Sequence, residues 1–160
     1  FLTNFSYAEG KVVYLDVNYL LLESEVGKYV NSNLKKISDD NNEVYKNFEA
    51  ELKSDEEKLL TQQNILKKED YEKKISELRN KFKSYQEKKN NKNKELNLLR
   101  NNAGNKILKS INEIMTEYSK KNSISLVITK QSIIIGKTEL DVTNDILELL
   151  NKKITKLELN

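Results

Sequence analysis

The fold of this chain is decided by two stretches: YVNSNLKKISDDNNEVYKNFEAELKSDEEKLL at residues 29–60 and YEKKISELRNKFKSYQEKKNNKNKELNLL at residues 71–99. Both carry apolar residues three or four positions apart, which places them on one stripe of a helix. A single helix over the whole proline-free stretch from Lys28 to Lys121 would be about 140 Å long. Most globular helices are far shorter, so we expect the chain to fold back on itself.

Two matching apolar seams predict where the chain reverses. A turn between Leu66 and Lys67 gives facing residues whose numbers add up to about 133, so that Phe48 faces Tyr85. The polar gap at Asn41 then lies opposite Lys92. An uninterrupted helix in a parallel coiled coil is the alternative. The expected seams consist of Val30, Leu34, Ile37, Val44, Phe48, Leu52 and Leu59 on one limb, and Tyr71, Ile75, Leu78, Phe82, Tyr85, Leu96, Leu99 and Ala103 on the other.

Composition excludes several classes of function. The 160 residues contain no cysteine and no histidine, which removes disulfides, thiolate chemistry and the commonest general base. We find no glycine-rich phosphate loop, nucleophile elbow or metal-ligand cluster, so we expect no enzyme activity and no cofactor. A third of the residues are charged, yet the net charge is only +3, which argues against a nucleic-acid partner.

The remaining segments predict a small β-rich body. Lys11–Val17 reads as a strand, followed by a short helix capped by Asn18. Ser123–Thr129 and Ser132–Ile135 read as two more strands around a tight turn at Lys130–Gln131. A last helix begins with Thr143 or Asn144 as its cap. So small a sheet has exposed edges, and we expect copies of the chain to pair along them.

These segments divide the chain into parts. We expect the body at residues 9–27 and 105–160, and a helical arm at residues 28–104. Gly27 supplies a corner at the start of the arm, and Gly104 is a candidate hinge at its end. Residues 1–8 close with a small-x-small pattern, which fits either the end of a secretory signal peptide or an ordinary terminus.

The chain resembles the Skp (OmpH) family of periplasmic chaperones of Gram-negative bacteria. The resemblance rests on KVVYLDVNYLLLESEVGK at Lys11 to Lys28, the charged hairpin, the Ile107-Leu108 segment that leads into SLVIT, and ELDVTNDILELLN at Glu139 to Asn151. It covers nearly the whole chain. Two departures are Lys106, where the family often has proline, and a weaker positive charge than in the best-known members.

The resemblance implies an α+β fold in which helical hairpins project from a body assembled as a homotrimer with a shared β-barrel. It implies that the arms hold unfolded outer-membrane proteins without nucleotide, in the periplasm, after export by a signal peptide. The residues that we expect in the trimer body are Val13, Leu15, Val17, Leu126, Ile128, Ile133 and Ile135.

Candidate client contacts are apolar residues that the expected seam leaves out: Tyr29, Tyr45, Leu60, Ile65 and Leu66. Each also fits an ordinary surface or flanking position. The lysine pairs Lys67/Lys68, Lys73/Lys74 and Lys88/Lys89 are candidates for contact with anionic lipid, or are simply a solvated helix face. A structural coiled-coil scaffold or adaptor of the envelope is the alternative function, although a spacer has no need of strands at its root.

Overall fold

The computed structural model describes residues 10–159 of the chain. These residues belong to two compact units. We name them the body unit (described residues 10–32 and 101–159) and the arm unit (residues 33–100). The arm unit is therefore shorter at both ends than the expected range of 28–104. The interpretation of residues 1–8 lies outside the described residues.

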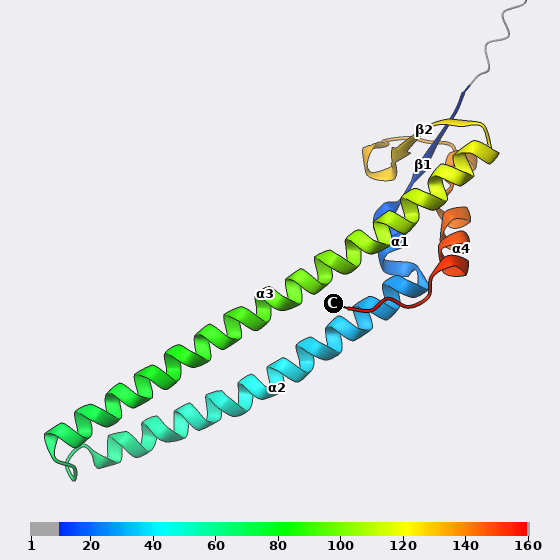
Figure 1. Cartoon of the computed structure of the whole chain (residues 1–160). Helices are drawn as coiled ribbons and strands as arrows, with labels where there is room; N and C mark the ends of the chain where they lie inside the picture. The colour runs from blue at the N-terminus through cyan, green and yellow to red at the C-terminus, as the bar shows by residue number, and fades with distance from the viewer. Residues whose placement is uncertain (1–9, 160) are drawn as a thin grey trace, which may run out of the picture. The chain divides into compact units, whose positions relative to one another are not determined.

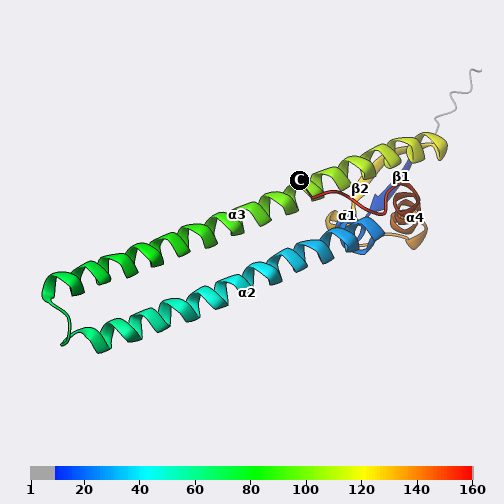
Figure 2. The same ribbon diagram turned by 60° about the horizontal axis from the view of Figure 1, so that its bottom comes forward.

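Two long helices form the arm unit. Helix α2 runs over Glu25–Gln62 and helix α3 over Lys68–Lys121, joined by a loop at residues 63–67. Within the arm unit the two helices lie side by side and run in opposite directions (Figure 1, Figure 2). The predicted reversal near Leu66 is thus confirmed, and the uninterrupted helix is excluded. Helix α3 stays helical through residues 101–105, and the role of Gly104 as a hinge stays a prediction.

The pairing of the two helices follows the predicted register. The ring of Phe48 stacks on that of Tyr85, with centroids 5.3 Å apart and an interplanar angle of 8°. Further along the hairpin, Lys81 Nζ lies 2.6 Å from Glu51 Oε1. Large aromatic side chains fill the space between the helices at this height, because stacked rings bury more apolar surface than aliphatic residues do.

Two parallel strands form the sheet of the body unit. Strand β1 (Lys11–Leu15) pairs with strand β2 (Ile124–Thr129), and Tyr14 lies opposite Ile128. The predicted strand at Ser132–Ile135 and its tight turn are wrong. A 3-10 helix, η1 (Lys130–Ser132), follows β2, and a second one, η2 (Thr138–Leu140), leads back toward β1.

The error has a physical reason. The run of β-branched isoleucines at residues 133–135 favours a strand, but a strand needs a neighbour for its backbone hydrogen bonds. Within the described residues the open side of β1 is taken by an isolated bridge between Tyr14 and Asp141, with Val142 N donating to Tyr14 O at 3.0 Å. Ile134 and Ile135 consequently stand 99% and 92% exposed.

The corner between β1 and α2 is built by capping side chains. Helix α1 (Val17–Glu23) begins after Asp16, whose Oδ1 accepts a hydrogen bond from Tyr19 N at 3.0 Å. The predicted strand therefore ends at Leu15, and Asp16 replaces Asn18 as the cap. At the other end of α1, the buried Ser24 accepts a hydrogen bond from Gly27 N at 3.1 Å and starts α2.

The last helix, α4, spans Thr143–Lys153. Its N-cap residue is Val142, which makes no capping hydrogen bond through its side chain, so the expected cap at Thr143 or Asn144 is wrong. The first helical amide, Thr143 N, is satisfied by the preceding carboxylate, because it donates to Asp141 Oδ1 at 3.0 Å. The hydroxyl of Thr143 instead accepts from Asp16 N at 2.9 Å, which ties α4 to the start of α1. The core of the body unit includes Val13, Leu15, Leu20, Val26, Ile107, Ile111, Ile114, Ile146 and Leu150, all buried.

Candidate functional site

An aromatic cluster lies between the helices of the arm unit. The ring of Tyr85 stacks on Phe48 and meets Tyr45 edge to face, with the Tyr45 and Tyr85 centroids 6.1 Å apart. Phe82 packs against Tyr85 from the same helix at 6.4 Å. Tyr45, Tyr85 and the neighbouring Leu52 are buried, which is uncommon in an arm of only two helices. We call Tyr45, Phe48, Leu52 and Tyr85 the aromatic cluster.

Charged side chains tie the two helices together around this cluster. Glu49 accepts hydrogen bonds from the Tyr85 hydroxyl and from Lys89 Nζ, the latter at 3.0 Å. Lys89 Nζ also lies 5.4 Å from the ring centroid of Tyr45, a distance typical of a cation–π contact. Lys81 Nζ bridges Glu51 and Asp55 at 2.6 Å each. The aromatic cluster is thus flanked by interhelical ion pairs on α2 and α3.

These contacts shift the ionisation of the charged groups. The hydrogen bonds from the Tyr85 hydroxyl and Lys89 lower the pKa of Glu49 from its ordinary value, and the hydrogen bond from Lys81 lowers the pKa of Asp55. The hydrogen bonds to Asp55 and Glu51 raise the pKa of Lys81. Glu49, Asp55 and Lys81 therefore keep their charges at neutral pH, and the ion pairs act as fixed charges between the two helices.

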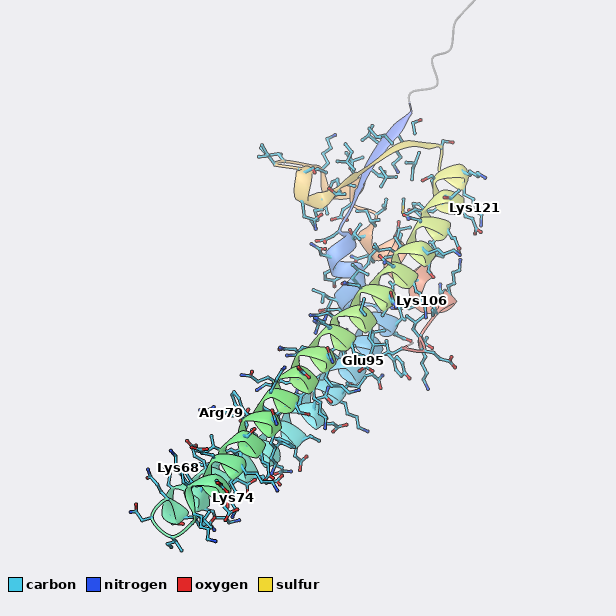
Figure 3. The ribbon with its side chains drawn as sticks, turned by 60° about the vertical axis from the view of Figure 1, so that its left-hand side comes forward. Lys68, Lys74, Arg79, Glu95, Lys106 and Lys121 are labelled. Carbon is cyan, nitrogen blue, oxygen red and sulfur yellow. The ribbon has the colours of Figure 1, made fainter. Side chains whose placement is uncertain are left out.

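Outside the aromatic cluster, the arm unit exposes single apolar side chains among its charges. They are well separated along both helices and the loop, as isolated surface apolar residues usually are. The most exposed are Val44 at 62%, Leu60 at 61%, Ile65 at 79%, Phe82 at 48% and Leu98 at 62%. Figure 3 shows the side chains around α3, with Lys68, Lys74, Arg79 and Glu95 marking its course through the arm unit.

The predicted client contacts occupy different environments. Leu60 and Ile65 are exposed near the tip, Leu66 is half-buried, and Tyr29 in the body unit is 37% exposed. The placement of Tyr45 off the seam is wrong, because its side chain is 8% exposed and packs on Tyr85. As a client contact, each of the five residues stays a prediction.

Two exposed residues were missed because they were assigned to the seam. Val44 and Phe82 were counted as seam residues, yet each stands largely in solvent. Counted from Leu34 with a first step of four, alternating steps of four and three residues pass through Tyr45 and skip Val44. With a first step of three they pass through Ile37 and reach Val44, so the sequence pattern left this choice open. For Phe82 we find no comparable signal.

The residues expected in a trimer body fall into two groups. Val13 and Leu15 are buried inside the single chain, and Val17, Ile128 and Ile133 are half-buried. Leu126 and Ile135 are exposed, at 53% and 92%. The exposed pair lies on and directly after β2, so part of the apolar surface that the described residues leave uncovered is there.

A polar network fixes the loop that follows β2. Lys130 Nζ lies 2.9 Å from Asp141 Oδ2. Burial raises the pKa of Asp141, but the hydrogen bonds from Thr143 and Lys130 outweigh it and leave that pKa below its ordinary value. On α3, the hydrogen bond between the Tyr118 hydroxyl and Asp145 raises the pKa of Tyr118 to about 12. Both contacts hold elements of the body unit together and form no catalytic arrangement.

Neither a metal site nor a membrane span is found in the part of the chain that the structure describes. No group of three or more acidic residues comes close enough to hold an ion among residues 10–159. None of the helices described is both long and apolar enough to cross a bilayer. What the geometry offers is a charged helical surface with isolated apolar side chains.

A protein-family comparison identifies what this architecture belongs to. The model of the OmpH-like outer membrane protein family matches residues 11–150, which include both units. The chain belongs to the OmpH-like family. Among curated relatives of this OmpH-like chain is the Skp-like protein of Pseudomonas aeruginosa, 27% identical over 152 residues that cover 92% of this chain and 88% of the relative.

A solved structure agrees with the fold. The crystal structure of an OmpH-like protein from Caulobacter crescentus, proposed to be an outer membrane chaperone, superposes with a TM-score of 0.87. The match covers 100% of this chain and 95% of the other at 18% identity. The predicted family is confirmed, and the predicted α+β fold with its helical hairpin is confirmed with it.

Proposed function

We propose that this protein is an ATP-independent holdase of the Gram-negative periplasm, which binds unfolded outer-membrane proteins between the helical arms of a homotrimer and keeps them from aggregating. The observation that carries the proposal is the OmpH-like family match over residues 11–150. The names of the Pseudomonas and Caulobacter relatives point in the same direction. Export by a signal peptide is part of the proposal.

The surface of the arm unit supports weak and adaptable binding. Each exposed apolar residue, such as Leu60 or Ile65, offers a small apolar surface for contact with an unfolded client. Charged residues lie close to it in the sequence. A single contact of this kind binds an unfolded chain poorly. Several such contacts on linked arms raise the overall affinity, because each later contact forms at a high effective concentration.

The body unit supports assembly with other copies. Leu126, Ile134 and Ile135 present exposed apolar surface beside β2, and a two-stranded sheet is marginal by itself. A trimer that shares strands would cover this apolar surface and would also extend the two-stranded sheet. The lysine pairs near the tip, Lys67/Lys68 and Lys73/Lys74, are positively charged, so we propose that they contact anionic lipid. We propose no nucleic-acid partner.

An aggregation assay tests this function. A chemically unfolded outer-membrane β-barrel protein is diluted out of urea without nucleotide, and light scattering is recorded. We expect scattering to be suppressed at roughly one trimer per client, and added ATP to change nothing. An equal mass of serum albumin is the control. Scattering that stays as high as with albumin would contradict the proposal and leave the structural scaffold as the better account.

A further inference from the structure

One flank of the aromatic cluster opens into a groove of 410 Å³. Its apolar floor is made by Val44, Phe48 and the rings of Tyr45 and Tyr85, and the lysines on its rim are Lys88 and Lys92. Its volume falls within the range of small-ligand pockets. Val44 stands at its edge with 62% of its surface exposed, so an incoming apolar group finds a partner there.

The floor of this groove contains a polar atom without a partner. Tyr45 is only 8% exposed, and its hydroxyl makes no hydrogen bond within the described part of the chain. Buried polar groups are nearly always paired, so an orphan hydroxyl needs an explanation. Lys92 lines the same groove as Tyr45. A polar ligand group that enters the groove can therefore supply the partner that the hydroxyl lacks.

Charge distinguishes the grooves that flank the aromatic cluster. The rim of the groove with Val44 carries two lysines and one carboxylate: Lys88, Lys92 and Glu95. Lys92 pairs with Glu95 at 2.7 Å, whereas Lys88 makes no ion pair among the described residues, which leaves its charge available.

The other two grooves carry no such excess of positive charge. One shares Tyr45 and carries two lysines and three carboxylates: Lys46, Lys89, Asp39, Glu43 and Glu49. The other shares Leu52 and Tyr85 and balances two cations with two carboxylates: Lys53, Arg79, Glu49 and Glu56. The groove with Val44 is therefore the one of the three that complements a negative ligand.

We propose that this groove binds an aromatic side chain of an extended client segment next to an acidic residue. The ring packs on Val44 and Phe48, the carboxylate faces Lys88 and Lys92, and a polar group of the client backbone pairs with the Tyr45 hydroxyl. This inference rests on the proposed function and names the segment that is held. Strands of outer-membrane barrels carry girdles of aromatic residues, so suitable segments are common in such clients.

The absence of tryptophan from the chain permits a direct test. The probe is a ten-residue serine- and threonine-rich peptide with Glu-Trp-Glu at its centre, and its partner carries Lys-Trp-Lys. Tryptophan emission and anisotropy report on the peptide alone. We expect the Glu-Trp-Glu peptide to bind the full-length protein at least fivefold more tightly than the Lys-Trp-Lys peptide.

Two substitutions at residues of equal exposure distinguish binding in the groove from binding to exposed apolar residues elsewhere on the arm unit. Val44→Ser removes the apolar edge of the groove, and Leu98→Ser removes an apolar side chain that is also 62% exposed but does not line it. We expect Val44→Ser to weaken binding of the Glu-Trp-Glu peptide about fivefold. Leu98→Ser should leave the affinity unchanged.

Tyr45→Phe provides a readout that a purely structural role would not give. Removal of an unpaired hydroxyl should leave the midpoint of thermal unfolding unchanged or higher. The same change should weaken peptide binding about threefold or more, because the ligand then loses its partner. A lower unfolding midpoint together with unchanged affinity would overturn the assigned role of the hydroxyl.

The groove proposal and the holdase proposal fail in different ways. Equal affinity for both peptides, equal effects of Val44→Ser and Leu98→Ser, or a change in sedimentation caused by Val44→Ser would overturn the groove. The last result would mean that a second copy of the chain covers it. Suppressed client aggregation together with any of these refutes the groove alone. Unsuppressed aggregation with Val44-dependent peptide binding refutes the holdase and supports the groove.

Discussion

Two glycines in the long helices have opposite surroundings. A Cβ atom at Gly27 would lie 2.2 Å from the carbonyl oxygen of Leu21, whereas at Gly104 it would meet nothing within 4 Å. Neither glycine has a positive φ. The sequence analysis assigned Gly27 to a corner for its backbone freedom and Gly104 to a hinge for its low helix propensity. The structure shows that Gly27 is needed because α1 and α2 approach each other closely. Gly104 has no steric reason to be glycine.

Alanine at these two positions should therefore change stability in opposite directions. We expect Gly27→Ala to lower the free energy of unfolding by about 2 kcal/mol, because the added methyl group collides with backbone. Gly104→Ala should raise it by about 0.5–1 kcal/mol through helix propensity. Urea denaturation measures both. Losses of equal size would show that the surroundings of Gly104 are not open.

Gly104→Ala also tests the hinge. If Gly104 allows α3 to bend when a client binds, alanine should slow or weaken client capture while it stabilises the free protein. If the Gly104→Ala protein captures unfolded client at the wild-type rate, Gly104 does not act as a hinge.

At the scale of elements, the aromatic cluster makes the middle of the hairpin its best-packed part. The register of α2 against α3 was predictable because apolar residues and polar gaps both match when the chain turns near Leu66. The exchange of Val44 for Tyr45 was not detected, because both residues are apolar and adjacent. The ring of Tyr45 occupies the buried position in place of Val44, because it buries more apolar surface than valine would and meets Tyr85 edge to face.

The interhelical ion pairs predict a loss of stability in acid. Glu49 and Asp55 have pKa values below their ordinary 4.5 and 3.8, so the unfolded chain takes up protons at these carboxyls more readily than the folded one. Their contribution is present in full above pH 4.5 and is lost as the pH falls through the lowered values. Lys81 and Lys89 have raised pKa values, so their contribution is lost only as the pH rises beyond 10.5.

The midpoint of thermal unfolding, measured by circular dichroism, should therefore depend little on these groups between about pH 5 and pH 10. Below pH 5 the midpoint should fall. Glu49→Gln should reduce the acid-side fall. The matched control is Glu87→Gln, since Glu87 makes no ion pair within the described residues. An acid-side profile that is the same for Glu49→Gln as for Glu87→Gln would contradict the assigned role of Glu49.

Amide hydrogen exchange tests the polar gap on the body side of the cluster. Residues 38–44 and 86–95 contain few buried side chains, in contrast to Tyr45 and Tyr85 beside them. We expect the fastest exchange within the helices of the arm unit at residues 39–42 and 88–94, and the slowest around Leu52 and Tyr85. Uniform protection along both helices would mean that the gap does not weaken the hairpin.

At the scale of the whole molecule, the single chain leaves its sheet incomplete. The described residues form two strands, and residues 132–135, where a third was expected, are not part of a strand in the structure described. Ile134 and Ile135 are among the most exposed apolar residues described. The run of isoleucines favours a strand, but the described residues supply no neighbour with which it could pair, so propensity alone gave a wrong prediction.

Sedimentation equilibrium tests the proposed assembly. We expect a particle of three times 18.7 kDa at micromolar concentration. Ile134→Lys and Ile135→Lys together should shift the mass toward that of one chain, because charge on an apolar contact is costly. Lysine at Leu22, which is 56% exposed, is the control and should leave the mass unchanged. A wild-type monomer under these conditions would exclude the shared barrel.

The sequence by itself determined the helical hairpin, its register, its tip and the strands that became β1 and β2. Each of these follows from periodicity that acts along the chain, such as the apolar stripe that brings Phe48 to Tyr85. Only the tertiary structure decided which of Val44 and Tyr45 is buried, because that outcome depends on contact with Tyr85 on the other long helix. The close approach at Gly27 and the hydrogen bonds that Asp16 and Asp141 accept at the starts of their helices join residues only a few positions apart. They depend on the exact path of the backbone between elements, which apolar periodicity does not specify.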